Sequence, residues 1–204
     1  MEQFIFHSDL KKELTFLIEN SHKLDGVLCF HGKAGCGKTT FSNYFAHLVS
    51  KEVHVFDASS HLFDKGSASN ILKKINETGR SLAGFSDDHY NANGFWDHCF
   101  IIDEWCNLSV SRQNAYKVTL ERVSKQLNAL FILIINTSQN KTVDKVLTSA
   151  ILSRSQTVNF DINKKDFPEV SELIKERYSV LDDEYIRNTL PDMRQIAKRG
   201  KLLS

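Results

Sequence analysis

Long hydrophobic runs and an excess of one charge are both missing from this sequence. Lys and Arg together number 26, and Asp and Glu 25, for a formal net charge of +1, so no overall field draws the chain to nucleic acid or to an anionic membrane. Any DNA contact must therefore be local. The longest apolar runs, such as residues 131–135, are far shorter than the roughly 18 residues that indicate a membrane span. Residues 1–9 lack the basic-then-apolar pattern of a signal peptide. We expect a soluble, cytoplasmic protein without a membrane partner.

Proline, glycine and cysteine are also scarce. With 2 prolines and 9 glycines in 204 residues, no linker or low-complexity tract marks a domain boundary. The four cysteines form no CxxC pair and have no His at zinc-finger spacing, which argues against a disulfide framework and a zinc ribbon. Apolar residues make up 41% of the chain, which is enough for one well-packed domain with a small appendage.

Short apolar runs alternate with segments in which apolar residues recur at helical spacing. Ser8 can cap a first helix, and another short helix face is expected at residues 71–75. Strands that alternate with helices predict an α/β fold, with a parallel sheet flanked by helices. The strand signals stop at Asp166, so we expect a core over residues 1–162 and a short helical segment over residues 163–204. The runs that predict buried strands are residues 27–31, 53–56, 99–102 and 130–135.

The segment after the first of these strands has the pattern of a phosphate-binding loop. It matches GxxxxGK[ST] between a predicted strand and a predicted helix, the context that this motif requires. Glycines let backbone N–H groups turn toward phosphates, and the helix N-terminus adds partial positive charge. Lys38 is expected to reach the outer phosphates and Thr39 to bind Mg²⁺. The predicted ATP-binding residues are Gly32, Lys33, Ala34, Gly35, Cys36, Gly37, Lys38, Thr39 and Thr40.

Polar side chains follow two later strands in the same way. Asp103 and Glu104 end the strand at 99–102, and open α/β sheets bind ligands at the carboxyl ends of their strands. Asp103 can hold Mg²⁺ and Glu104 can polarise an attacking water, which favours hydrolysis over transfer to a second substrate. Asn136 follows the strand at 130–135. If the two strands are neighbours, Asn136 could hydrogen-bond the water or the terminal phosphate; otherwise it is an ordinary turn residue.

Taken in order, these motifs resemble those of the AAA+ ATPases, and within them the small ATPase subunits of sliding-clamp loaders, including those of bacteriophages. Residues 56–60 are similar to the Asn-Ala-Ser-Asp segment of that family. Residues 151–155 resemble its Ser-Arg-Cys box, and residues 190–195 resemble the Gly-Asp-Met-Arg segment of its lid. The resemblance implies that Arg154 enters the ATP site of a neighbouring subunit and that Arg194 contacts the nucleotide within its own subunit. Either arginine could instead be an ordinary salt-bridged surface residue.

The same resemblance implies a biological setting. It implies that the chain hydrolyses Mg-ATP as part of a homo- or hetero-oligomeric ring on primer–template DNA. It also implies a sliding clamp as a partner, and the family includes proteins encoded by viruses. Clamp-loader subunits continue into a helical collar, whereas this sequence stops at Ser204, just after the lid. We therefore expect either a ring without a collar or a related ATPase with another task.

Contacts to DNA are less well indicated. By the resemblance, five basic residues would line the inner face of a ring, but that number is ordinary for a protein surface. Aromatic residues before the acidic strand end could stack on bases or could anchor their own loop. The basic residues are Lys65, Lys73, Lys74, Arg80 and Arg112, and the aromatic ones are His89, Tyr90, Phe95 and Trp96.

Three other functions remain open at this point. A superfamily 3 viral helicase domain has a phosphate loop, a carboxylate pair, a strand-end Asn and a later Arg, but nothing that matches residues 192–194. A nucleotide kinase has this size, but the sequence shows no Arg-rich lid for a second phosphate site. A nucleotide-gated binding module would bind ATP without turning it over.

Overall fold

The computed structural model describes residues 1–59, 96–138 and 141–203. Within them lies one sheet of five parallel strands in the order β2-β3-β4-β1-β5. This arrangement confirms the predicted α/β fold. The strands are β1 (Val27–Gly32), β2 (Ser50–Asp57), β3 (Trp96–Asp103), β4 (Ala129–Asn136) and β5 (Gln156–Asn159).

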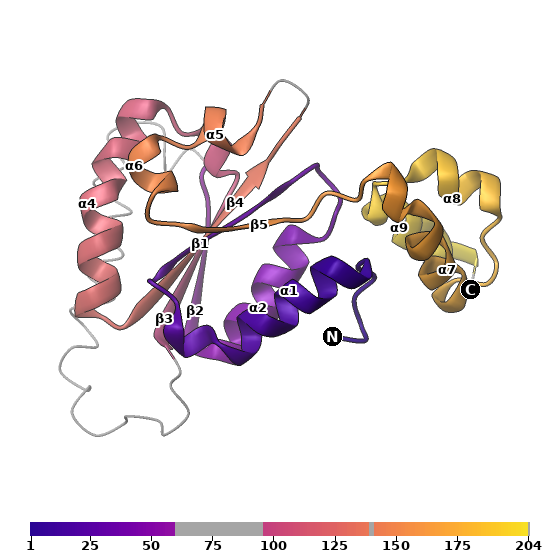
Figure 1. Ribbon diagram of the computed structural model, residues 1–204, viewed down its shortest axis with the longest axis horizontal. Coiled ribbons are helices and arrows are strands. Elements are labelled where there is room, and N and C mark those ends of the chain that lie inside the picture. Colours follow the sequence, from indigo (N-terminus) through magenta and orange to yellow (C-terminus); the bar gives the residue numbers. More distant parts are fainter. Residues whose placement is uncertain (60–95, 139–140, 204) are drawn as a thin grey trace.

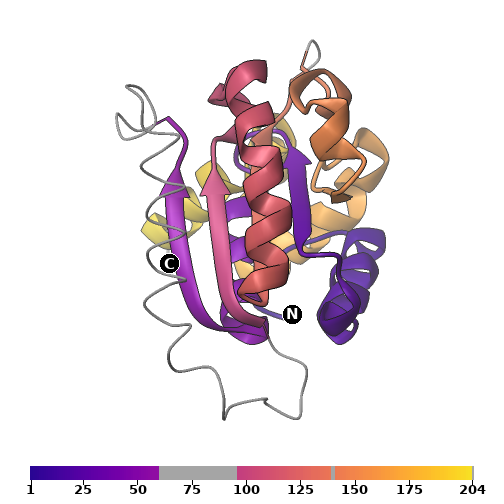
Figure 2. The same cartoon turned by 90° about the vertical axis from the view of Figure 1, so that its left-hand side faces the viewer.

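Helices cover both faces of the sheet (Figures 1 and 2). Phe100 and Phe131 pack toward α4, whereas their neighbours Ile101 and Ile132 pack toward α1 and α2. Because successive side chains of a strand point to opposite faces, strands that are covered on both sides must be apolar throughout. One face carries α1 (Ser8–Glu19) and α2 (Lys38–Val49), and the other carries α4 (Val110–Gln126), α5 (Val143–Val146) and α6 (Ser149–Leu152).

Three C-terminal helices follow β5 and a 3₁₀ turn at Lys164–Asp166. They pack around an apolar cluster of their own that includes Val170, Ile186 and Ile196, and they lie on the side of the molecule away from α4 (Figure 1). No described helix is long and apolar enough to cross a membrane. The helices are α7 (Phe167–Arg177), α8 (Asp183–Thr189) and α9 (Met193–Leu203).

Residues near the N-terminus join these helices to the core. The Arg177 guanidinium donates to the carbonyl oxygens of Glu2 and Gln3, each at 2.5 Å. The Ser8 N–H donates to Glu169 Oε1 at 2.7 Å. The sequence predicted Ser8 as the cap of α1, but Ser8 is the first residue of this helix. The cap is His7, whose Nδ1 accepts from the Leu10 N–H at 3.4 Å.

The order of the strands decides which side chains can meet. β1 lies between β4 and β5, and Gly32 at its end pairs with Asn136 at the end of β4. β3 lies on the other side of β4, and Asp103 at its end pairs with Asp57 of β2. The polar strand ends therefore gather at one edge of the sheet, beside the loop that follows β1.

Several residues singled out in the sequence lie outside the described part of the chain. They are the short helix face at 71–75, the four basic residues Lys65, Lys73, Lys74 and Arg80, and the aromatic residues His89, Tyr90 and Phe95.

Candidate ATP site

The loop between β1 and α2 curls around the side chain of Lys38. Gly35 and Gly37 have φ angles of +85° and +90°, a left-handed conformation that glycine adopts without steric cost. The Lys38 side chain is buried, and its ammonium donates to the carbonyl oxygens of Gly32 at 2.8 Å and Lys33 at 2.6 Å. Lys38 is thus held inside the predicted phosphate loop. Ala34, Thr39 and Thr40 are exposed at its surface.

Cys36 packs inside this loop and does not face its surface. Its side chain is buried, and Sγ donates to the Lys33 carbonyl at 2.5 Å. Burial raises the pKa of the thiol, although the nearby Lys38 ammonium acts in the opposite direction. Cys36 therefore remains a neutral thiol that closes the turn.

The two predicted magnesium ligands meet although they lie far apart in the sequence. Thr39 Oγ1, in the first turn of α2, donates to Asp103 Oδ2 at 2.8 Å. The other carboxylate oxygen, Asp103 Oδ1, accepts from the Glu104 N–H at 2.8 Å. A hydroxyl and a carboxylate are the hard oxygen donors that Mg²⁺ prefers, and this ion usually takes few protein ligands beside water and phosphate. The pair therefore fits Mg²⁺.

Glu104 and Asn136 also come together. Asn136 Nδ2 donates to Glu104 Oε1 at 2.7 Å, because β3 and β4 are neighbours in the sheet. The backbone of Glu104 has a φ of +54°, a conformation that costs a residue other than glycine about 1–3 kcal/mol and often marks a functional position. The carboxylate that was expected to polarise water is thus oriented by the side chain that was expected to assist it.

Asp161 is a residue at this edge that the sequence did not indicate. It follows β5, and its Oδ1 accepts from the Lys33 N–H at 2.7 Å. The Lys33 amide is therefore directed at Asp161. A Cβ atom added to Gly32 would lie 3.1 Å from the Asp161 backbone nitrogen, and Gly32 has a φ of +147°, so both the close approach of the two segments and the backbone conformation favour glycine there. A lone Asp after a short strand has no motif that could have revealed it.

The C-terminal helices touch the phosphate loop through Asp192. Its Oδ1 caps α9 by accepting from the N–H groups of Arg194 at 3.0 Å and Gln195 at 3.2 Å. A Cβ atom on Gly35 would overlap that same oxygen. Arg194 is therefore in the first turn of a helix that begins at the loop. Its side chain is exposed, and within the described ranges it has no hydrogen-bond or ion-pair partner.

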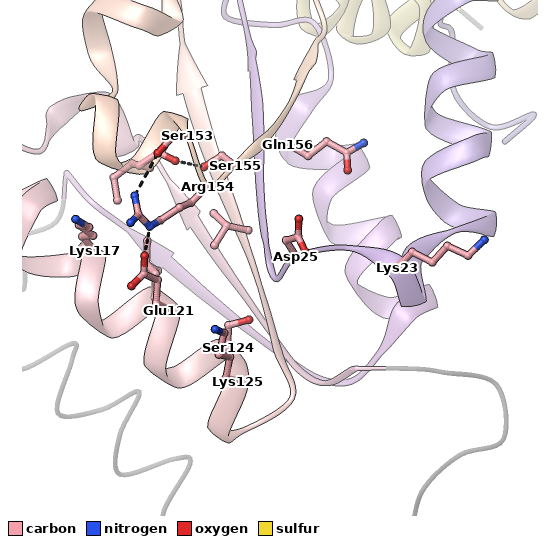
Figure 3. Close-up of a pocket in the computed structure, with 13 residues that line it drawn as sticks. Lys23, Asp25, Lys117, Glu121, Ser124, Lys125, Ser153, Arg154, Ser155 and Gln156 are labelled. Atoms are coloured by element: carbon pink, nitrogen blue, oxygen red, sulfur yellow. Dashed lines mark hydrogen bonds and ion pairs between the residues drawn. The ribbon is translucent and has the colours of Figure 1, made fainter.

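Arg154 lies at the opposite end of the sheet. It follows α6 and precedes β5, whose first residue, Gln156, pairs with Leu28 of β1. Leu28 is four residues before Gly32, so the start of β5 is about 13 Å from the phosphate loop along the strand. The Arg154 guanidinium forms an ion pair with Glu121 of α4 (Figure 3). It also donates to the Ala150 carbonyl at 2.8 Å.

A pocket of about 490 Å³ opens beside Arg154 (Figure 3). It lies at the amino ends of β1 and β5, away from the phosphate loop, and its charged lining has four cations and two carboxylates. The pocket is therefore not part of the site around Lys38. Its charged residues are Lys23, Asp25, Lys117, Glu121, Lys125 and Arg154.

Trp96 and Arg112 are the described members of the two groups considered for DNA contact. The Trp96 indole Nε1 donates to the Ser21 carbonyl at 3.1 Å, and the ring packs against the core cluster under α1 and α2. This side chain anchors the start of β3, so the alternative of base stacking is not favoured for it. Arg112 lies in α4 and is partly exposed.

A parallel sheet with a Lys-bearing glycine loop after β1 and an acidic end of β3 defines the class of P-loop NTPases. The particular family follows from the sequence. Residues 28–160 match the family described as "ATPase family associated with various cellular activities (AAA)", so the chain belongs to the AAA ATPases. No curated protein matches the sequence significantly.

Solved structures with the same fold include two DNA-related ATPases. The RuvB Holliday junction branch migration motor of Thermotoga maritima is 16% identical, with a TM-score of 0.60 over 95% of this chain and 60% of that chain. A mutant of that motor is 17% identical, with a TM-score of 0.62 over 97% of this chain and 62% of that chain. The replication initiator DnaA, bound to AMPPCP and single-stranded DNA, is 19% identical, with a TM-score of 0.58 over 98% of this chain and 63% of that chain. This chain spans about three fifths of the length of these proteins, and the likeness establishes the fold.

Proposed function

We propose that this chain hydrolyses Mg-ATP as one subunit of a ring that acts on DNA, most like the ATPase of a clamp loader. One observation carries the proposal. Thr39 with Asp103 and Asn136 with Glu104 are already joined by hydrogen bonds of 2.8 Å and 2.7 Å at the edge of the sheet beside Lys38. Groups suited to a metal, to a water molecule and to phosphate are thus held within one site.

The residues support hydrolysis in a defined way. The Lys38 ammonium would exchange the two loop carbonyls for phosphate oxygens of ATP, and the N–H groups at the start of α2 would face the same phosphates. Thr39 and Asp103 would hold Mg²⁺, which when bound neutralises charge on the phosphates. The Glu104 carboxylate would accept the proton of the attacking water, and the Asn136 amide would keep that carboxylate in place.

The position of Arg154 supports a role between subunits. The residue is too far from the phosphate loop of its own chain to reach that loop, but its end of the sheet can face the loop of a neighbouring copy. Its ion pair with Glu121 is about 40% exposed on each side, and such a pair is worth about 0–1 kcal/mol. Exchanging Glu121 for a phosphate of the neighbour's ATP would therefore cost little.

Arg194 and the C-terminal helices complete the proposed site as a lid. The helices of residues 163–204 would cover the nucleotide bound by the core of residues 1–162, and Arg194 would swing from the first turn of α9 onto the phosphates. The contact of Asp192 with Gly35 supports this placement.

Action on DNA is supported by the motif order. Of the neighbours in structure, one is a Holliday junction motor and another is bound to single-stranded DNA. At 16–19% identity this likeness shows a shared fold, so the DNA and clamp partners rest on the resemblance of residues 151–155 and 190–195 to clamp loaders.

ATPase activity measured against protein concentration tests the proposal. Phosphate release per subunit should rise with concentration and rise again with primer–template DNA and a candidate clamp. A specific activity that is full in dilute solution and independent of concentration would contradict the role of Arg154 between subunits. Transfer of phosphate to a nucleotide acceptor would indicate a kinase, and strand displacement without a clamp would indicate a helicase such as those of superfamily 3.

A further inference from the structure

Three side chains that can bind a metal meet on one face of the sheet, away from the ATP site. Glu52 and His54 are two residues apart on β2, so both point to the same face. His98 of β3 is the register partner of Glu52. His54 Nε2 lies 3.4 Å from His98 Nδ1, and Glu52 Oε2 lies 3.6 Å from each of these nitrogens. Among the described residues, no other group of three or more His, Cys, Asp or Glu side chains is arranged to hold a metal.

The two Glu52 separations fit a metal better than they fit hydrogen bonds. A hydrogen bond between an imidazole and a carboxylate is about 2.7–2.9 Å long when one group is charged, and the two Glu52 contacts are longer, at 3.6 Å. Zinc binds His nitrogen at about 2.0–2.1 Å and carboxylate oxygen at about 2.0–2.2 Å, which puts tetrahedral ligands about 3.3–3.5 Å apart. The observed triangle, with sides of 3.4–3.6 Å, has nearly the size of one face of such a tetrahedron.

We propose that Glu52, His54 and His98 form a zinc-binding site. Two imidazoles and one carboxylate are a donor set that Zn²⁺ takes in proteins, where water or another donor fills the fourth position. Two nitrogen donors distinguish this set from the oxygen donors that Mg²⁺ prefers.

The surroundings hold the ligands in place and leave a way in for the ion. The His98 side chain is 8% exposed, whereas that of Glu52 is 46% exposed, so solvent reaches the cluster from the Glu52 side. The ring of His54 stacks on Phe100, with centroids 4.8 Å apart and planes 18° apart. Pairing of β2 with β3 fixes the backbone beneath all three ligands.

The site is separate from the one proposed for magnesium. His98 precedes Asp103 by five residues of the same strand, which is about 16 Å. A metal that joins β2 to β3 binds the folded chain and not the unfolded one, so it stabilises the fold. The proposal does not depend on ATP hydrolysis or on assembly of a ring.

Zinc titration of the full chain tests the site. The protein should carry no histidine tag, and it should be stripped with a chelator and kept free of nucleotide. Calorimetry is expected to show one tightly bound Zn²⁺ per chain that an excess of Mg²⁺ does not displace. At about 100 times the Kd, zinc should raise the Tm by roughly 5–10 °C. Cobalt in place of zinc should give the visible absorption of a four-coordinate ion.

Variants at the two more exposed ligands locate the binding. Glu52→Gln and His54→Gln should each lower zinc affinity by roughly tenfold or more, while ATP binding at the distant loop shows that the variants fold. His22→Gln, at an exposed histidine outside the cluster, is the matched control and should bind as the wild type does. The proposal is overturned if the wild type binds no zinc, if Mg²⁺ displaces it, or if both ligand variants keep wild-type affinity.

Discussion

The two ends of the central sheet are built differently. At the carboxyl ends, side chains from α2, β3 and β4 are joined by hydrogen bonds of 2.7–2.8 Å around a buried Lys38. At the amino ends, the main charged group, Arg154, is held by local contacts and by one exposed ion pair. The hydrogen bonds of the first arrangement all lie within one chain. The second arrangement holds its charge in an exposed ion pair, which is compatible with the role between subunits proposed for Arg154.

Removal of Arg154 should give the largest effect and should separate the two ends. Arg154→Ala is expected to lower ATP turnover in the assembled state by about 10³–10⁵-fold, the usual contribution of an arginine supplied by a neighbour. Turnover in dilute solution should not change. The measurement is phosphate release at low and high protein concentration, with Lys125→Ala, another cation of the same pocket, as control. An equal loss in dilute solution would show that Arg154 acts within its own chain or on the fold.

Removal of the Glu104 charge tests the carboxyl end. Glu104→Gln keeps the shape of the side chain and an oxygen for the Asn136 amide, but it cannot take a proton from water. We expect turnover to fall by about 10²–10⁴-fold while ATP affinity is kept. Turnover and nucleotide binding should be measured on the same samples, and Glu172→Gln, at an exposed carboxylate of α7, serves as control. Unchanged turnover would exclude Glu104 as the general base.

A methyl group on Gly35 tests whether the carboxyl end extends to the C-terminal helices. Gly35→Ala forces a residue with a side chain into a φ of +85° and against Asp192, so we expect a loss of about 1–3 kcal/mol in ATP affinity or in stability. Ala34→Gly, at the adjacent exposed position, should change little. Part of the loss should disappear in an Asp192→Ala background, where the overlap with the carboxylate is gone but the close Cα of residue 192 and the backbone strain remain. If the losses of the two single variants simply add in the double variant, the contact between residues 35 and 192 contributes no interaction energy.

Glu121→Gln tests how firmly the amino end holds its arginine. The ion pair is exposed, so we expect a change in the free energy of unfolding of less than about 1 kcal/mol and full turnover in the assembled state. Asp183→Asn removes the comparably exposed pair with Lys175 and is the control. A large loss of turnover would show that Glu121 positions Arg154 for its task.

Acidification should have the smallest effect, at the carboxyl end. Burial lowers the pKa of His31 below its ordinary 6.5; Asp161 opposes this shift and Lys38 adds to it. Folding therefore favours the neutral ring, and its contribution is present above pH 6.5 and is lost as the pH falls below that value. Urea unfolding at about pH 7 and about pH 5.5 with a chelator should show the decline. His31→Gln should reduce it and His22→Gln should not; equal slopes would contradict the assignment.

The core of the candidate site could be predicted because strand ends converge in a parallel sheet. Lys38, Thr39, Asp103 and Glu104 follow apolar runs, and each run placed its polar end at the correct edge. The neighbour of each strand could not be predicted, because an apolar run indicates burial and says nothing of pairing. From the sequence alone, the Asn136 contact depends on whether β3 and β4 are neighbours, and the structure shows that they are.

Contacts between segments that are distant in the sequence could not be predicted for a related reason. Asp161 accepts the Lys33 amide and Glu121 holds Arg154, yet each lies more than thirty residues from its partner without a shared motif. The cap of α1 is His7, one residue before the predicted Ser8, and the Ser8 N–H donates to Glu169 of α7. A local pattern cannot include a partner that the fold delivers from elsewhere.

The Asp192 carboxylate has a consequence for communication across the molecule. One oxygen both starts α9 and rests on the turn at Gly35, so a displacement of either segment must be felt by the other. Such coupling is reciprocal in free energy. A shift of α9 is therefore expected to alter ATP binding at the proposed site, and ATP binding there is expected to favour a shift of α9 by the same free energy.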